Sequence, residues 1–350
     1  MARLVPVLLI HGFNGAPGDW TDGGFRQYLL GHGDLDAGLV RLFQYGAAAD
    51  GTYNNRGDLR QIASRLAGAG LDDAEQMSCS VERLSADSVA RGGPAQVTLI
   101  AHSLGGIISR YYLSRRTPDE FGTAYSGKVG RLITIGAPHR GADLARLARL
   151  APRYSPIWFV IRVLERLGVA PALPAKAIKE WEASLDQQQL AARAALAPEA
   201  ATPQNRVALT DSPIYQQIAP DSPVLAALNR AGTMPAHVRC HTFYGDIRVR
   251  LRLLSHQGGT ALLDHTTSFG DLVVPTTSAR AIPGARATPH AYVTEQRIDY
   301  TQGTFLLTRD GATPAPAGRS LAGRLPATSH CELLSNPAVH TGVLAALGPD

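Results

Sequence analysis

The stretch Gln96–Leu113, QVTLIAHSLGGIISRYYL, decides how the rest of the sequence is interpreted. It begins with an apolar, β-branched run typical of a buried strand and ends with the apolar spacing of a helix. Between the two stands one serine, Ser103, surrounded by the small residues Ala101, Gly105 and Gly106. Glycine in a helix costs about 1 kcal/mol relative to alanine, so these small residues must serve another purpose. The stretch predicts a tight turn from strand to helix with Ser103 at its tip.

The five residues Ala101 to Gly105 fit the pattern Gly-x-Ser-x-Gly with alanine in place of the first glycine. In such a turn, the residues two before and two after the serine approach too closely for large side chains. The serine is held in a strained backbone conformation, with its Oγ exposed at the amino end of a helix. The helix dipole favours negative charge that develops there. We therefore interpret Ser103 as a nucleophile, with His102 and Leu104 beside it in the turn.

Length and composition favour one globular domain over residues 1–350, because 45% of the residues are apolar and 18% are charged. The net charge of +5 comes from scattered arginines rather than a basic block, so we expect no nucleic-acid partner. No apolar run approaches the roughly 18 residues of a membrane-spanning helix. No cleavage site follows the first apolar run. We expect a soluble protein located in the cytoplasm.

Apolar, β-branched runs predict strands, and helical patterns lie between the first four of them. The predicted strands cover residues 4–10, 39–45, 96–101, 128–136 and 237–245. Strands that alternate with helices favour an α/β fold, with a mostly parallel sheet and helices on both faces. Ligands of such sheets bind at the carboxyl ends of the strands.

The regular alternation breaks after Gly141, and residues 151–236 are interpreted as a helical insertion. Its stretch 157–167 places apolar residues on one face, which Trp158 and Phe159 widen. This face either packs on the body of the domain or forms a movable cover over an apolar site. The second interpretation predicts transient contact with a lipid interface and a preference for medium or longer acyl chains.

A serine nucleophile needs a carboxylate and a histidine, in the chain order serine, acid, histidine on this kind of fold. The acid candidates are Asp246, Asp264 and Asp271. We favour Asp271, because it precedes an apolar run and a proline that would place it at a strand end.

Three histidines follow Asp271 and are candidates for the base. His290 opens an apparent strand, and His340 lies inside the last helical run, where we expect it to be solvated. His330 occupies the loop before that helix, where an imidazole can reach back toward the serine. We favour His330.

A tetrahedral intermediate requires two backbone N–H donors. One is the amide of Leu104, directly after the nucleophile. The first strand ends in His11-Gly12-Phe13, and Gly12 allows the chain to turn so that the amide of Phe13 faces the site. We therefore expect an oxyanion hole formed by Phe13 and Leu104.

With these residues in place, the chain resembles the lipases and esterases of the α/β-hydrolase superfamily, including bacterial triacylglycerol lipases. The resemblance rests on VLLIHGFNG, TLIAHSLGGIISRYYL, LITIGAPHRGADLA, IAPDSPVLAALN, GDLVVPTTSA and SHCELLSNPAV. It implies an α/β-hydrolase fold with a helical lid, and a triad of Ser103, Asp271 and His330.

By this resemblance the protein is a serine carboxylester hydrolase that acts on lipid or other small acyl esters through an acyl-enzyme. No cofactor is implied. No metal is implied either, because the calcium site of some relatives has no matching aspartate just after His330. The same triad also serves acyltransferases, thioesterases and amidases, and a non-catalytic lipid-binding member of the superfamily is the alternative from another class.

Overall fold

The computed structural model describes residues 2–13, 17–45, 57–68, 80–142, 213–254, 261–271, 273–301, 304–309, 315–316, 327–330 and 332–348. Within these ranges, nine strands form one sheet in the order β2-β1-β3-β4-β5-β7-β8-β9, with β6 paired to β5. The six strands from β2 to β7 in this order are all parallel. The predicted parallel sheet is therefore confirmed.

Each predicted strand lies where the apolar pattern indicated it. The parallel strands are β1 (Val7–Ile10), β2 (Val40–Phe43), β3 (Val97–His102), β4 (Val129–Ile135), β5 (Arg239–Leu254) and β7 (Ala287–Thr301). The fifth strand was expected to end at Gly245, but β5 continues to Leu254. Its continuation pairs with β7 along almost the whole length of both strands.

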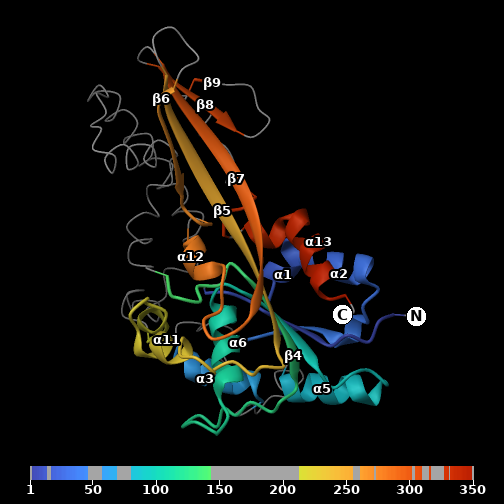
Figure 1. Cartoon of the computed structure of the whole chain (residues 1–350). Coiled ribbons are helices and arrows are strands. Elements are labelled where there is room, and N and C mark those ends of the chain that lie inside the picture. Colours follow the sequence, from blue (N-terminus) through green and yellow to red (C-terminus); the bar gives the residue numbers. More distant parts are fainter. Residues whose placement is uncertain are drawn as a thin grey trace, which may run out of the picture.

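Helices cover both faces of the parallel sheet (Figure 1). Alternation along β1 sends Leu8 and Ile10 to one face and Val7 and Leu9 to the other, so each face has its own apolar core. The first core contains residues of α3 (Leu59–Leu66), α5 (Val81–Ala90), α6 (Leu104–Ser114), α10 (Pro213–Gln217) and α11 (Pro223–Leu228). The second contains residues of α2 (Phe25–Gly33), α1 (Asp19–Asp22), η5 (Glu332–Ser335) and α13 (Pro337–Ala346). The shorter helices are η1 (Ala37–Leu39) and α12 (Thr276–Ala279).

The long strands β5 and β7 extend beyond the helical layers as an arm (Figure 1). Along the arm, β6 (Ala261–Ser268) runs antiparallel to β5, and β8 (Thr304–Arg309) runs antiparallel to β7. The two-residue strand β9 (Ala315–Pro316) pairs with β8. The hairpin of β7 and β8 accounts for the strand-like segment that the sequence shows between Asp271 and His330.

The described part of the predicted insertion, residues 213–236, contains α10 and α11 and no strand. Trp158 and Phe159 lie outside the described residues. The described residues on the two sides of the insertion meet, because the Ala142 amide donates to the carbonyl of Ile218 at 3.2 Å. Among the described residues, no helix is both long and apolar enough to cross a membrane.

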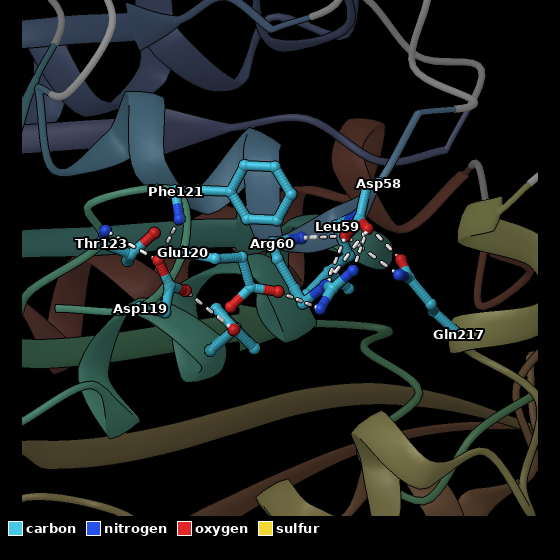
Figure 2. A network of polar contacts seen from close by, with 9 residues as sticks. Asp58, Leu59, Arg60, Asp119, Glu120, Phe121, Thr123 and Gln217 are labelled. Carbon is cyan, nitrogen blue, oxygen red and sulfur yellow. Dashed lines mark hydrogen bonds and ion pairs between the residues drawn. The ribbon is translucent and has the colours of Figure 1, made fainter. Parts of the chain in front are cut away.

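A polar network fastens α10 to the start of α3 (Figure 2). Asp58 caps α3 by accepting from the amide of Arg60 at 2.8 Å, and the side chain of Gln217 donates to the same carboxylate at 2.9 Å. The Leu59 amide in turn donates to Gln217 Oε1 at 2.8 Å. Arg60 extends the network by pairing with Asp58 and Glu120. The returning end of the insertion is therefore bound to the domain through side chains as well as backbone.

Candidate active site

Ser103 lies between the last residue of β3 and the first residue of α6, as the sequence predicted. Its backbone has φ 50° and ψ −121°, so a non-glycine residue occupies a positive φ at the tip of the turn. A Cβ on Gly105 would lie 2.6 Å from the carbonyl oxygen of Ile10, which no side chain can tolerate. A small residue is required at Gly105, two positions after the serine, because α6 starts directly against the end of β1.

His330 joins Ser103 to Asp271. Its Nε2 lies 2.9 Å from Ser103 Oγ, and its Nδ1 lies 2.8 Å from Asp271 Oδ2. Asp271 is fully buried, and its other oxygen accepts from the amides of Val273 at 3.0 Å and Val274 at 2.7 Å. The His330 amide also donates to the Asp271 carbonyl at 2.9 Å. Hydrogen bonds therefore hold both carboxylate oxygens of Asp271. Asp271 in turn positions His330 through one hydrogen bond to its imidazole and one to its backbone amide.

The other acid candidates have different partners. Asp246 is buried and accepts from Arg248 Nε at 2.7 Å and Ser268 Oγ at 2.6 Å, so both of its oxygens face the base of the arm. Asp264 pairs with Arg250 on β5. Neither carboxylate is bonded to His330.

The other histidine candidates are likewise engaged elsewhere. His290 Nε2 lies 3.2 Å from His241 Nδ1 on the neighbouring strand. His340 donates to the Leu334 carbonyl at 2.6 Å and is only 5% exposed. The expectation that His340 is solvated is wrong, because its face of α13 packs against Phe25 of α2.

The turn after β1 lies directly against the serine. A Cβ on Gly12 would meet Ser103 Cβ at 2.9 Å and His102 Nδ1 at 3.0 Å, so only glycine fits. Phe13 follows Gly12 and packs at the edge of the first core. His102 is buried, and its Nε2 lies 3.2 Å from the carbonyl oxygen of His330. The structure therefore brings the turn after β1, the strand-to-helix turn and the His330 loop into contact.

Burial favours the neutral form of two imidazoles near Ser103, those of His11 and His102. Burial lowers the pKa of His11 to about 4, although a hydrogen bond to Gly12 opposes the shift. Burial, reinforced by the neighbouring His330, holds the pKa of His102 well below its usual value. Over the described residues, no three His, Cys, Asp or Glu side chains group to form a metal site. The chemistry that these residues can perform is proton transfer from a serine hydroxyl to a histidine oriented by a carboxylate.

Comparison with known protein families finds a match over part of the chain. The family model of the PGAP1-like alpha/beta domain matches residues 59–158, a range that contains Ser103. The chain thus has the α/β-hydrolase fold.

Solved structures similar to the chain include lipase 1 of Pelosinus fermentans, at 12% identity and TM-score 0.46, covering 99% of this chain and 98% of that one. The lipase of Staphylococcus hyicus is 12% identical with TM-score 0.41, over 97% of this chain and 91% of that one. EstA of Clostridium botulinum is 13% identical with TM-score 0.36, over 86% of this chain and 82% of that one.

Proposed function

We propose that the protein is a serine carboxylester hydrolase, a lipase or esterase, in which Ser103 is the nucleophile. The observation that supports this most directly is the continuous pair of hydrogen bonds from Ser103 Oγ through His330 to Asp271, at 2.9 and 2.8 Å. The strained backbone of Ser103 supports it further, since a serine with only a structural role needs no positive φ.

In the proposed reaction, Ser103 Oγ attacks the ester carbonyl while His330 Nε2 takes the hydroxyl proton. Asp271 holds the imidazole in the tautomer with Nδ1 protonated and stabilises the imidazolium that forms. The carbonyl oxygen becomes an oxyanion, for which the amides of Phe13 and Leu104 are the proposed donors. The alcohol leaves with the proton from His330, and an acyl-enzyme remains. Water, activated by the same histidine, then releases the acid.

The test compares wild type with Ser103→Ala on a short p-nitrophenyl ester and with a fluorophosphonate probe. We expect Ser103→Ala to lose activity by about 10⁶-fold in kcat and to lose all labelling, because triad members act as a unit. Ser85→Ala is the matched control. Ser85, on α5, is also a buried serine, but its hydroxyl donates to the carbonyl of Ala95 in the segment before β3. A Ser103→Ala protein that keeps a tenth of the activity would overturn the proposal.

Product analysis identifies the acceptor of the acyl group. A hydrolase releases free acid in the presence of an added alcohol, amine or thiol at low concentration. Predominant formation of a new ester, amide or thioester would instead assign acyl transfer to the same triad.

A further inference from the structure

Tyr45 reaches from the end of β2 into the turn that follows β1. The parallel register pairs Ile10 with Phe43, which brings Tyr45 level with Gly12, since each lies two residues beyond its paired residue. The Tyr45 hydroxyl donates to the carbonyl oxygens of His11 at 2.8 Å and Gly12 at 2.9 Å. Its side chain is fully buried, and burial raises its pKa well above the usual value, so the hydroxyl remains a donor.

The side chain of His11 also donates a hydrogen bond to the carbonyl oxygen of Gly12. Its Nδ1 lies 3.0 Å from the Gly12 oxygen, and because a carbonyl only accepts, Nδ1 carries the proton. The His11 ring stacks on Tyr45 with centroids 3.9 Å apart and planes 6° apart. The Gly12 oxygen is therefore the acceptor of two buried donors whose rings support each other.

The peptide bond between Gly12 and Phe13 links this arrangement to the site. A trans peptide is planar, and its C=O and N–H point in opposite directions. The described residues contain no cis peptide. Holding the Gly12 oxygen toward Tyr45 therefore turns the Phe13 N–H away from Tyr45. Glycine offers little resistance to rotation of this peptide, so without the two donors its orientation would not be fixed.

We propose that Tyr45 is a positioning residue that locks the Gly12–Phe13 peptide in the orientation that presents the Phe13 amide to the reacting carbonyl. This inference rests on the proposed function, because it assigns that amide to the oxyanion. The orientation of this peptide should affect the stabilisation of the transition state and not the binding of substrate, because the oxyanion exists only after attack by Ser103.

The experiment is Tyr45→Phe, which removes the hydroxyl and keeps the ring. Loss of one oxyanion donor costs about 10²- to 10³-fold in kcat, and a donor left misaligned part of the time costs less. We expect kcat to fall about 10- to 100-fold with KM within twofold of wild type and the pH profile unchanged, because the triad is intact. Replacement of Tyr45 by 4-aminophenylalanine restores a donor at the same position and should recover most of the loss.

Tyr112→Phe is the matched control, because Tyr112 is also a fully buried tyrosine and its hydroxyl bonds to Ser126, away from the site. Tyr112→Phe should leave kcat unchanged, while lowering the midpoint of thermal unfolding by about as much as Tyr45→Phe does. A Tyr45→Phe enzyme with wild-type kcat would overturn the inference and leave the hydrolase proposal standing. If Tyr45→Phe does not fold, 4-aminophenylalanine with kcat below a hundredth of wild type overturns it. A wild-type protein that neither hydrolyses esters nor reacts with the fluorophosphonate refutes the proposed function itself.

Discussion

Gly245→Ala tests how closely the His330 loop is built onto the sheet. A Cβ on Gly245 would lie 1.9 Å from the carbonyl oxygen of Thr328, whereas ordinary contact begins at 3.4 Å, so the two must separate by 1.5 Å (3.4 − 1.9). Gly245 lies within β5, where the paired strands β4 and β7 hold the backbone. The strain therefore moves Thr328 and, two residues later, His330. A misplacement of about 1 Å in an active site costs about 10²-fold, so we expect kcat to fall at least that far.

The assay measures kcat on a p-nitrophenyl ester and the rate of fluorophosphonate labelling, on protein that shows cooperative thermal unfolding. Gly31→Ala is the control. Gly31 lies in α2, where a Cβ would meet no atom within 4 Å, so this change should keep activity and stabilise the protein by up to about 1 kcal/mol. If Gly245→Ala keeps both wild-type kcat and labelling, then the approach of Thr328 to β5 does not position His330, and the reasoning fails.

Two further predictions concern the acid and the buried histidines. Asp271→Asn should favour the wrong imidazole tautomer of His330 and lower kcat by about 10⁴-fold. The kcat of Asp246→Asn should stay within tenfold of wild type. If steady-state kinetics rank the two variants the other way round, the acid is Asp246. Burial lowers the pKa of His11, of His102 and of His139, a fully buried histidine four residues after the end of β4. The folded protein therefore resists a protonation that these histidines accept in the unfolded chain below their usual pKa of about 6.5. The free energy of unfolding should therefore fall as pH drops below 6.5, by up to about 1.4 kcal/mol per pH unit for each histidine. Urea unfolding at pH 7 and pH 5 measures this, and equal stability at the two values would contradict it.

The parts of the fold that local patterns encode were predictable. Ser103 and its small neighbours indicate the turn between β3 and α6, since a strand of 6 residues, the serine and a helix of 11 residues occupy 18 consecutive positions (6 + 1 + 11). The extent of β5 was not predictable in this way. Gly245 followed by Asp246 is typical of a turn, yet the strand continues because β6 and β7 pair with it over the arm.

Contacts between distant segments account for the remaining differences. Tyr45 has no local signal beyond its place at the end of a predicted strand, and its proposed role emerges only when β1 and β2 are set in register. His340 has the setting of a surface helix residue, but the packing of α13 on α2 buries it. The preference for Asp271 over Asp246 rested on the apolar run and the proline that follow Asp271 in the sequence. The partners of Asp246, Arg248 and Ser268, lie on the arm, which the sequence pattern did not show.

The meeting of Ala142 and Ile218 bears on how this fold can diversify. The hydrogen bond between them joins two residues that lie 76 positions apart in the chain (218 − 142). Closing a flexible loop costs entropy that grows only with the logarithm of its length, and doubling the length adds about 0.6 kcal/mol. Insertions, deletions or a wholly different segment can therefore be exchanged at this junction while Ser103, His330 and Asp271 keep their places.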